Sequence, residues 1–243
     1  MTLRASEATI LPRIVLCDLD DTILDDYAGI ESAWHRVCRD TSERAEDIDA
    51  NRLFNEIART RQWYWSDAKR HRQGRLDLLK ASQFVLHKSL LSLGFDMPDM
   101  ARDLAGSYRD LREQELRLFP GAVDALKRMR LTGIRLGLIT NGEASVQRAK
   151  LERFNLTRWF DHVVIEGEFG VGKPDQRVYT ASMKALDASP CETWCVGDNL
   201  EWEVAAPQSL GIYSIWVDSR GRGLPRDHHI VPDRTIRSLS ELP

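Results

Sequence analysis

Five short apolar runs without polar alternation constrain the fold of this 243-residue chain most strongly. They span residues 14–17, 134–139, 163–165, 193–196 and 212–217. Runs of this kind are typical of strands that are buried on both faces, as in a parallel sheet. Helical segments such as 122–131, after Pro120-Gly121, and 176–186, after Pro174, lie between them. Because strands and helices alternate in this way, the sequence predicts a doubly wound α/β core.

The stretch from residue 25 to residue 116 has a different pattern, with few β-branched runs and many Arg, Leu, Ala and Glu residues. Apolar residues between 78 and 93 fit one long helix that ends near Gly94. A second helix is expected from Met100 to Leu118, after Pro98. We therefore predict an all-helical module at 25–116, inserted after the first strand of a core made of residues 1–24 and 117–243.

Composition excludes several classes of function. The chain has 34 Lys and Arg residues against 37 Asp and Glu residues, so its formal charge of −3 provides no field for nucleic acid or an anionic membrane. No apolar run approaches the ~20 residues of a spanning helix, and Met1 to Arg13 lack the apolar stretch of a signal peptide. The four cysteines form no CxxC pair or zinc-type spacing. We expect a cytoplasmic protein without a nucleic-acid or membrane partner, and the oligomeric state stays open.

Polar segments follow four of the predicted strands or the loops beyond them. They are Asp18-Leu19-Asp20-Asp21-Thr22, Thr140-Asn141-Gly142, Gly172-Lys173-Pro174 and Gly197-Asp198, the last followed by Glu201 and Glu203. In an open parallel sheet, ligands bind beyond the carboxyl ends of the strands, where the strand order reverses. Carboxylates next to an apolar strand are costly unless a cation or hydrogen bonds compensate them. This cluster therefore predicts a site for a hard cation such as Mg²⁺, which prefers oxygen ligands.

The same segments suit phosphoryl chemistry. Thr140 offers a hydroxyl group, and backbone N–H groups surround Asn141. A carboxylate that approaches a dianionic phosphate to ~4 Å is repelled by roughly 8 kcal/mol at an effective dielectric constant near 20. Mg²⁺ and Lys173 together could offset that repulsion, so the cations make an aspartate nucleophile workable.

With these four motifs in order, the sequence resembles the haloacid dehalogenase superfamily. Asp18-Leu19-Asp20-Asp21-Thr22 matches its DxDx[TV] signature, and the three other segments match its second, third and fourth motifs. The resemblance runs from about Ile14 to the C-terminus and implies a Rossmann-like core with a helical cap of the first type. It also implies a phosphatase that acts on a small phosphorylated metabolite, such as a sugar phosphate or a nucleoside monophosphate.

The resemblance assigns a role to each motif residue. Asp18 attacks phosphorus and forms an aspartyl-phosphate. Asp20 protonates the leaving alcohol and then activates water. Thr140 and Lys173 hold the phosphoryl group, together with Asn141. Asp18, the backbone carbonyl of Asp20 and Asp198 hold Mg²⁺.

One departure from the family concerns the second acid of the fourth motif, where an Asn-Asp pair is common. This chain has Trp202-Glu203 at that point, so Glu203 is the candidate for the second acidic role, and Glu201 is the alternative. Asp20 also separates subclasses of the family, because dehalogenating and phosphonate-cleaving relatives lack an acid there.

Other functions stay open at this level. A phosphomutase of the same fold is the alternative that the sequence scarcely separates, and a receiver-type signalling module is a less favoured one. In the cap, the aromatic residues 63–65 and the basic residues 69–72 could touch a substrate. Packing within the cap is the more common outcome for such a helix.

Overall fold

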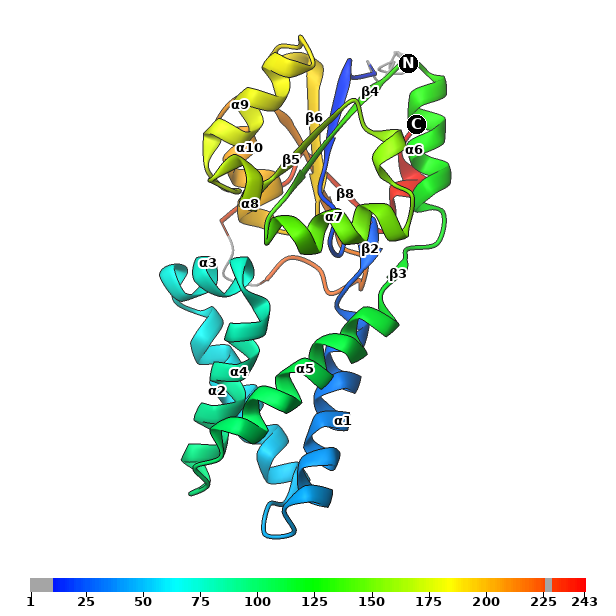
Figure 1. The fold of residues 1–243 in the computed structure, drawn as a ribbon. Helices are drawn as coiled ribbons and strands as arrows, with labels where there is room; N and C mark the ends of the chain where they lie inside the picture. The colour runs from blue at the N-terminus through cyan, green and yellow to red at the C-terminus, as the bar shows by residue number, and fades with distance from the viewer. Residues whose placement is uncertain (1–10, 226–228) are drawn as a thin grey trace, which may run out of the picture.

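The computed structural model describes residues 11–225 and 229–243. The first ten residues of the predicted core, most of the segment searched for a signal peptide, and residues 226–228 lie outside that description. Six parallel strands form the central sheet in the order β5-β4-β1-β6-β7-β8 (Figure 1). Their bounds are β1 Ile14–Cys17, β4 Arg135–Thr140, β5 His162–Ile165, β6 Thr193–Gly197, β7 Tyr213–Val217 and β8 Arg234–Ile236. The predicted α/β class is confirmed, and the five predicted strands agree with these bounds to within one residue.

Helices cover both faces of this sheet, which explains why its strands lack polar alternation. Val15 and Cys17 of β1 pack in one apolar cluster with α6 (Ala122–Leu131). Ile14 and Leu16 point to the opposite face, where they pack with α9 (Gln176–Ala185). Because successive side chains of a strand alternate between faces, a strand covered on both sides must be apolar throughout.

The core contains further helices and turns. They are α7 Ala144–Arg153, α8 Glu166–Phe169, α10 Ala206–Gln208 and a π-helical turn at Leu200–Ala205, with 3₁₀ turns at Thr157–Trp159, Pro190–Glu192 and Leu239–Glu241.

Five helices form the inserted module, which lies below the sheet in Figure 1. Their bounds are α1 Ala28–Arg44, α2 Ala50–Trp65, α3 Ala68–Leu76, α4 Leu78–Ser92 and α5 Pro98–Glu115. Asp49, Asp67 and Asp77 cap the amino termini of α2, α3 and α4 with their side chains. The module has an apolar cluster of its own, which includes Trp34 and Leu86.

The chain passes between the sheet and the helical module through a short antiparallel ribbon. β2 (Leu24–Asp25) pairs with β3 (Arg117–Leu118), and Leu24 lies opposite Leu118. The prediction that the last helix of the module continues to Leu118 is therefore wrong, since α5 ends at Glu115. Pairing with a strand more than ninety residues earlier in the chain overrides local helix propensity there.

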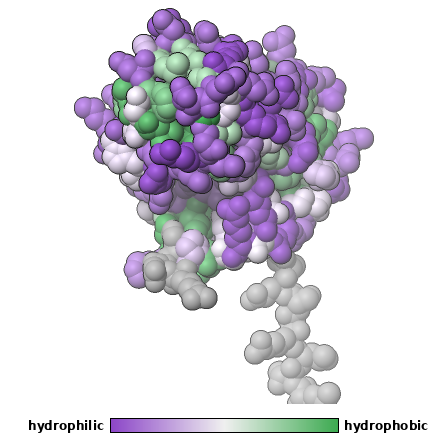
Figure 2. Space-filling model, turned by 90° about the horizontal axis from the view of Figure 1, so that it is seen from below, coloured by the Kyte–Doolittle hydropathy of each residue, from purple (hydrophilic) through white to green (hydrophobic). Residues whose placement is uncertain are grey.

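The surface is largely polar where Figure 2 views it, from below the helical module. Hydrophobic residues gather there only in small areas between hydrophilic ones. Within the described residues, no helix combines the length and the apolar character that crossing a membrane requires.

Candidate active site

The four polar segments meet at the carboxyl edge of the sheet. β1 and β6 are neighbours, and Cys17 pairs with Val196, so Asp18 and Asp198 follow adjacent strand ends. The chain leaves β1 for β4 on one side and later returns to β6 on the other side. Ligands bind at such a reversal of strand order in open α/β sheets.

A buried lysine joins three of the segments. Lys173 is 2% exposed, and its Nζ lies 2.5 Å from Asp18 Oδ1 and 2.7 Å from Glu203 Oε1. Asp18 also accepts a hydrogen bond from Thr22 Oγ1 at 3.0 Å, and Glu203 accepts one from the backbone N–H of Asn199 at 2.9 Å. One ammonium group therefore lies between two buried carboxylates.

Charge crowding shifts the pKa values of this group. Burial lowers the pKa of Lys173, but Asp18 and Glu203 outweigh burial and hold the pKa above its ordinary value. Burial raises the pKa of Glu203 to about 7, against the opposing effect of Lys173. Burial, followed by the charges of Asp18 and Glu203, raises the pKa of Asp198 well above its usual range.

This donor set fits a magnesium ion. Asp18 and Asp198 follow adjacent strand ends and offer carboxylate oxygens, which are the ligands that Mg²⁺ prefers. Within residues 11–225 and 229–243, no three acidic, histidine or cysteine side chains form a metal-binding group. A metal held here would therefore need a backbone oxygen in addition to the two carboxylates, as the sequence predicts for Asp20.

A glycine allows the carboxylates to approach the strand end this closely. A Cβ atom on Gly197 would lie 2.2 Å from Glu203 Cγ and 2.8 Å from Asp18 Cβ. No side chain fits at this position without displacing both acids.

The second motif is held differently from what its residue types indicate. Asn141 does not point its amide at an open site: its Nδ2 donates to the Lys173 carbonyl at 2.8 Å, and its Oδ1 accepts from the Lys173 N–H at 2.7 Å. Asn141 thus fixes the loop that carries Lys173. Because its side-chain amide is engaged there, Asn141 has only backbone groups left to offer a phosphate. Thr140, which is 1% exposed, accepts a hydrogen bond from Gln147 Nε2 at 2.5 Å.

Asp20 lies in a network that the motifs did not indicate. Lys150 Nζ donates to Asp20 Oδ1 at 2.7 Å, and Gln147 Nε2 donates to Asp20 Oδ2 at 2.8 Å. Burial raises the pKa of Asp20, while Lys150 opposes that rise. Gln147 and Lys150 are three residues apart on α7, the helix that follows Thr140, and this spacing on one helix face was the available signal.

The structure distinguishes the two candidates for the second acid. Glu203 is 1% exposed and contacts Lys173, whereas Glu201 is exposed on the same π-helical turn. Of the two, Glu203 is the residue that contacts Lys173.

The helical module contacts the core beside this site. Arg75 of α3 forms a bidentate ion pair with Glu166, with distances of 2.6 Å and 2.7 Å. Glu166 is 1% exposed and also accepts the backbone N–H of Gly142 at 3.2 Å. The His71 ring lies edge-on to Trp202, with 5.6 Å between ring centroids. These contacts join α3 to the loops that carry the second and fourth motifs.

The aromatic segment at residues 63–65 packs largely within the helical module. Tyr64 is buried and lies 5.5 Å from the Phe84 ring, while Trp65 lies edge-on to Tyr64 at 5.1 Å. Trp63 is more exposed, and the Arg70 guanidinium lies 3.9 Å from its ring centroid. The contacts of this segment are those of a packed helix with cations along one face.

Comparison with known proteins places this geometry in context. A sequence profile described as haloacid dehalogenase-like hydrolase matches residues 12–211. The chain is 32% identical over 260 residues to phosphoserine phosphatase of Thermus thermophilus, across 95% of this chain and 97% of that protein. It is 28% identical to glyceraldehyde 3-phosphate phosphatase of Methanopyrus kandleri, across 95% of each. The HAD-hydrolase YfnB from Bacillus subtilis has the same fold, with a TM-score of 0.72, 22% identity, and coverage of 95% of this chain and 96% of that one.

Proposed function

Because the chain belongs to the haloacid dehalogenase-like hydrolases, we propose that it is a magnesium-dependent phosphatase acting on a small phosphorylated metabolite. The carrying observation is that Lys173 lies within 2.7 Å of both Asp18 and Glu203, at the edge of the sheet where Thr140 ends β4 and Asp198 follows β6. Relatives named phosphoserine phosphatase and glyceraldehyde 3-phosphate phosphatase support this class of substrate.

In this proposal Asp18 is the nucleophile. Its carboxylate oxygen forms a bond to phosphorus while the bond between phosphorus and the alcohol oxygen breaks. Asp20 donates its proton to the departing alcohol oxygen. Water then attacks the aspartyl-phosphate, loses a proton to Asp20, and releases inorganic phosphate. Lys173 holds a phosphate oxygen and balances the charge of Asp18, and Thr140 donates its hydroxyl hydrogen to another phosphate oxygen.

Asp18, the backbone carbonyl of Asp20 and Asp198 would hold the metal. When bound, Mg²⁺ neutralises the charge on the phosphate and orients its oxygens. Glu203 positions Lys173, because its carboxylate holds the Lys173 ammonium group.

We also propose that residues 25–116 act as a cap over a core of residues 1–24 and 117–243. The two crossings between these parts are β2 and β3, which pair with each other and form one narrow connection. Such a connection allows the cap to close over a substrate and exclude water. All four cysteines are free, as expected for a cytoplasmic protein, which is the location we propose.

Phosphate release from a panel of substrates tests the proposal. The panel contains phosphoserine, glyceraldehyde 3-phosphate, sugar phosphates and nucleoside monophosphates, each with Mg²⁺ and with a chelator. We expect release only with Mg²⁺, and none from Asp18→Asn. The matched control is Asp187→Asn, which changes an exposed aspartate of the core and should keep full activity. Activity that persists in Asp18→Asn contradicts the mechanism, and an isomerised phosphate without free phosphate indicates a mutase instead.

A further inference from the structure

Helix α7 holds both carboxylate oxygens of Asp20. Lys150 Nζ lies 2.7 Å from Oδ1, and Gln147 Nε2 lies 2.8 Å from Oδ2. The same Gln147 amide is 2.5 Å from Thr140 Oγ1. The orientation of the Asp20 carboxyl group is therefore determined by a helix that begins more than 120 residues later in the chain, in addition to its own loop.

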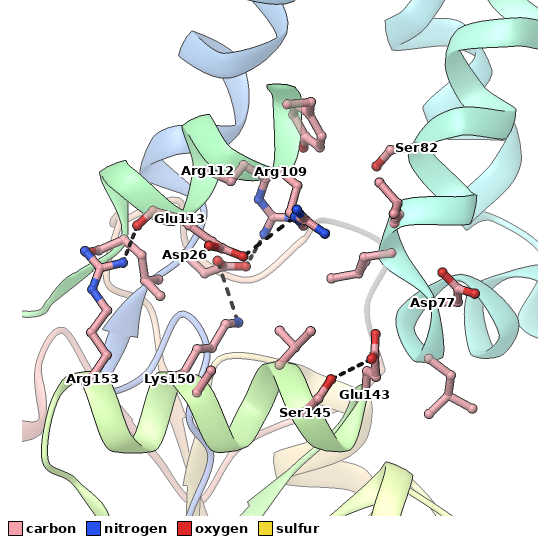
Figure 3. Close-up of a pocket in the computed structure, with 17 residues that line it drawn as sticks. Asp26, Asp77, Ser82, Arg109, Arg112, Glu113, Glu143, Ser145, Lys150 and Arg153 are labelled. Carbon is pink, nitrogen blue, oxygen red and sulfur yellow. Dashed lines mark hydrogen bonds and ion pairs between the residues drawn. The ribbon is translucent and has the colours of Figure 1, made fainter. Parts of the chain in front are cut away.

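The lysine also connects Asp20 to the cap. Lys150 Nζ lies 3.8 Å from Asp26 Oδ1, and Asp26 forms an ion pair with Arg112 of cap helix α5. The Lys150 side chain is 12% exposed, so this chain of charges is largely shielded from water. In Figure 3, Lys150 from α7 and Arg112 from α5 approach Asp26 from opposite sides.

The same three residues line one wall of a cavity of about 500 Å³ between α4, α5 and α7. Since α5 belongs to the cap and α7 to the core, movement of the cap would change both this cavity and the Asp26–Arg112 contact. Successive ion pairs thus connect Asp20 to Lys150, Lys150 to Asp26, and Asp26 to cap helix α5.

Resting on the proposed function, we propose that Lys150 is a positioning residue for Asp20. It holds the Asp20 carboxyl group where the leaving oxygen of the substrate receives its proton. Through Asp26 and Arg112, it makes this orientation depend on the placement of α5. A general acid must lie within hydrogen-bond reach of the leaving oxygen, and a displacement of about 1 Å is enough to lower the rate about 100-fold.

Leaving-group dependence tests this role. A proton is needed when an alkyl alcohol leaves, but p-nitrophenolate leaves without one. In Lys150→Met, we expect kcat/KM to fall about 10- to 100-fold for an alkyl phosphate such as glycerol 2-phosphate, and about threefold or less for p-nitrophenyl phosphate. Because kcat/KM reports the steps up to phosphoryl transfer, the later hydrolysis does not mask the difference.

Three further variants sharpen the test. Lys150→Arg keeps the charge and should recover most of the activity. Arg148→Met is the matched control, because Arg148 lies on the same helix but pairs with Glu168 at the surface, and both of its rates should be unchanged. Asp26→Asn should show a smaller loss of the same selective kind. If Lys150→Met does not fold, Lys150→Gln takes its place in the comparison.

An equal loss for both substrates in Lys150→Met would overturn the proposal, since it would indicate a general structural role. An unchanged Asp26→Asn would remove the connection to the cap. Adding Lys150→Met to Asp20→Asn should cause no further selective loss, because the group that Lys150 positions is then no longer an acid. These outcomes differ from failure of the proposed function, which would appear as activity in Asp18→Asn.

Discussion

Replacing Lys173 by methionine removes the charge on which the centre of the site depends, while nearly keeping the length of the side chain. Lys173 is 2% exposed and contacts Asp18 at 2.5 Å and Glu203 at 2.7 Å. The variant leaves two buried carboxylates without their shared cation. Removing one partner of a buried ion pair costs about 3–5 kcal/mol. We expect a loss of this size in the free energy of unfolding of the metal-free protein.

Urea unfolding in the presence of a chelator, monitored by circular dichroism, measures this loss of stability. Lys184→Met, which changes an exposed lysine of α9, should stay within about 0.5 kcal/mol of the parent. Combining Lys173→Met with Glu203→Gln should restore part of the stability, because one unpaired charge is then gone. Lowering the pH from about 7 to about 5 should also reduce the stability difference between Lys173→Met and the parent, because protonation removes the charge of an unpaired carboxylate. If Lys173→Met is as stable as Lys184→Met, the charge arrangement described here is incorrect.

Three other perturbations follow from single contacts. Arg75→Met leaves the buried Glu166 carboxylate without its bidentate partner and should lower the free energy of unfolding in urea by about 3 kcal/mol. Arg75→Lys should recover only part of that stability, because lysine keeps the charge but not the bidentate geometry. Gly197→Ala places a Cβ atom 2.2 Å from Glu203 Cγ and should cost about 1–3 kcal/mol, whereas Gly106→Ala, with nothing within 4 Å, should not destabilise the protein. The folded-state pKa of Glu203, about 7, lies above the ordinary value of 4.5. Its stabilisation is therefore fully present below about pH 4.5 and is lost as the pH rises through about 7, and Glu203→Gln should flatten that part of the pH–stability curve of the metal-free protein.

Five strands and two helices of the core were predictable, because the signal for each of them lies within its own segment. The apolar run at 14–17 predicts β1 to the residue, and helix 122–131 is found where the pattern indicates it. β8 was not predicted, because Arg234–Ile236 contains one buried apolar side chain and too few residues to show a period. The end of α5 was misplaced for a related reason, since pairing with β2 decides it.

The candidate site divides in the same way. The four motifs could be assigned to one edge of the sheet, because the carboxyl ends of parallel strands lie together. The roles of individual polar groups within them could not be separated. Asn141 bonds to the Lys173 backbone, and Glu203 rather than Glu201 reaches Lys173. Each of these outcomes depends on the direction of one side chain, which residue type does not determine.

By itself, the sequence determined the class of fold, the helical insertion and the set of residues available for phosphoryl chemistry. These follow from hydrophobic period and motif order, which are properties of neighbouring residues. Only the tertiary structure decided which groups touch: Lys173 with Asp18 across 155 positions, Lys150 with Asp20 across 130, and Arg75 with Glu166 across 91. Such contacts form between side chains that packing brings together from distant segments, and the hydrophobic periodicity of the sequence does not predict them.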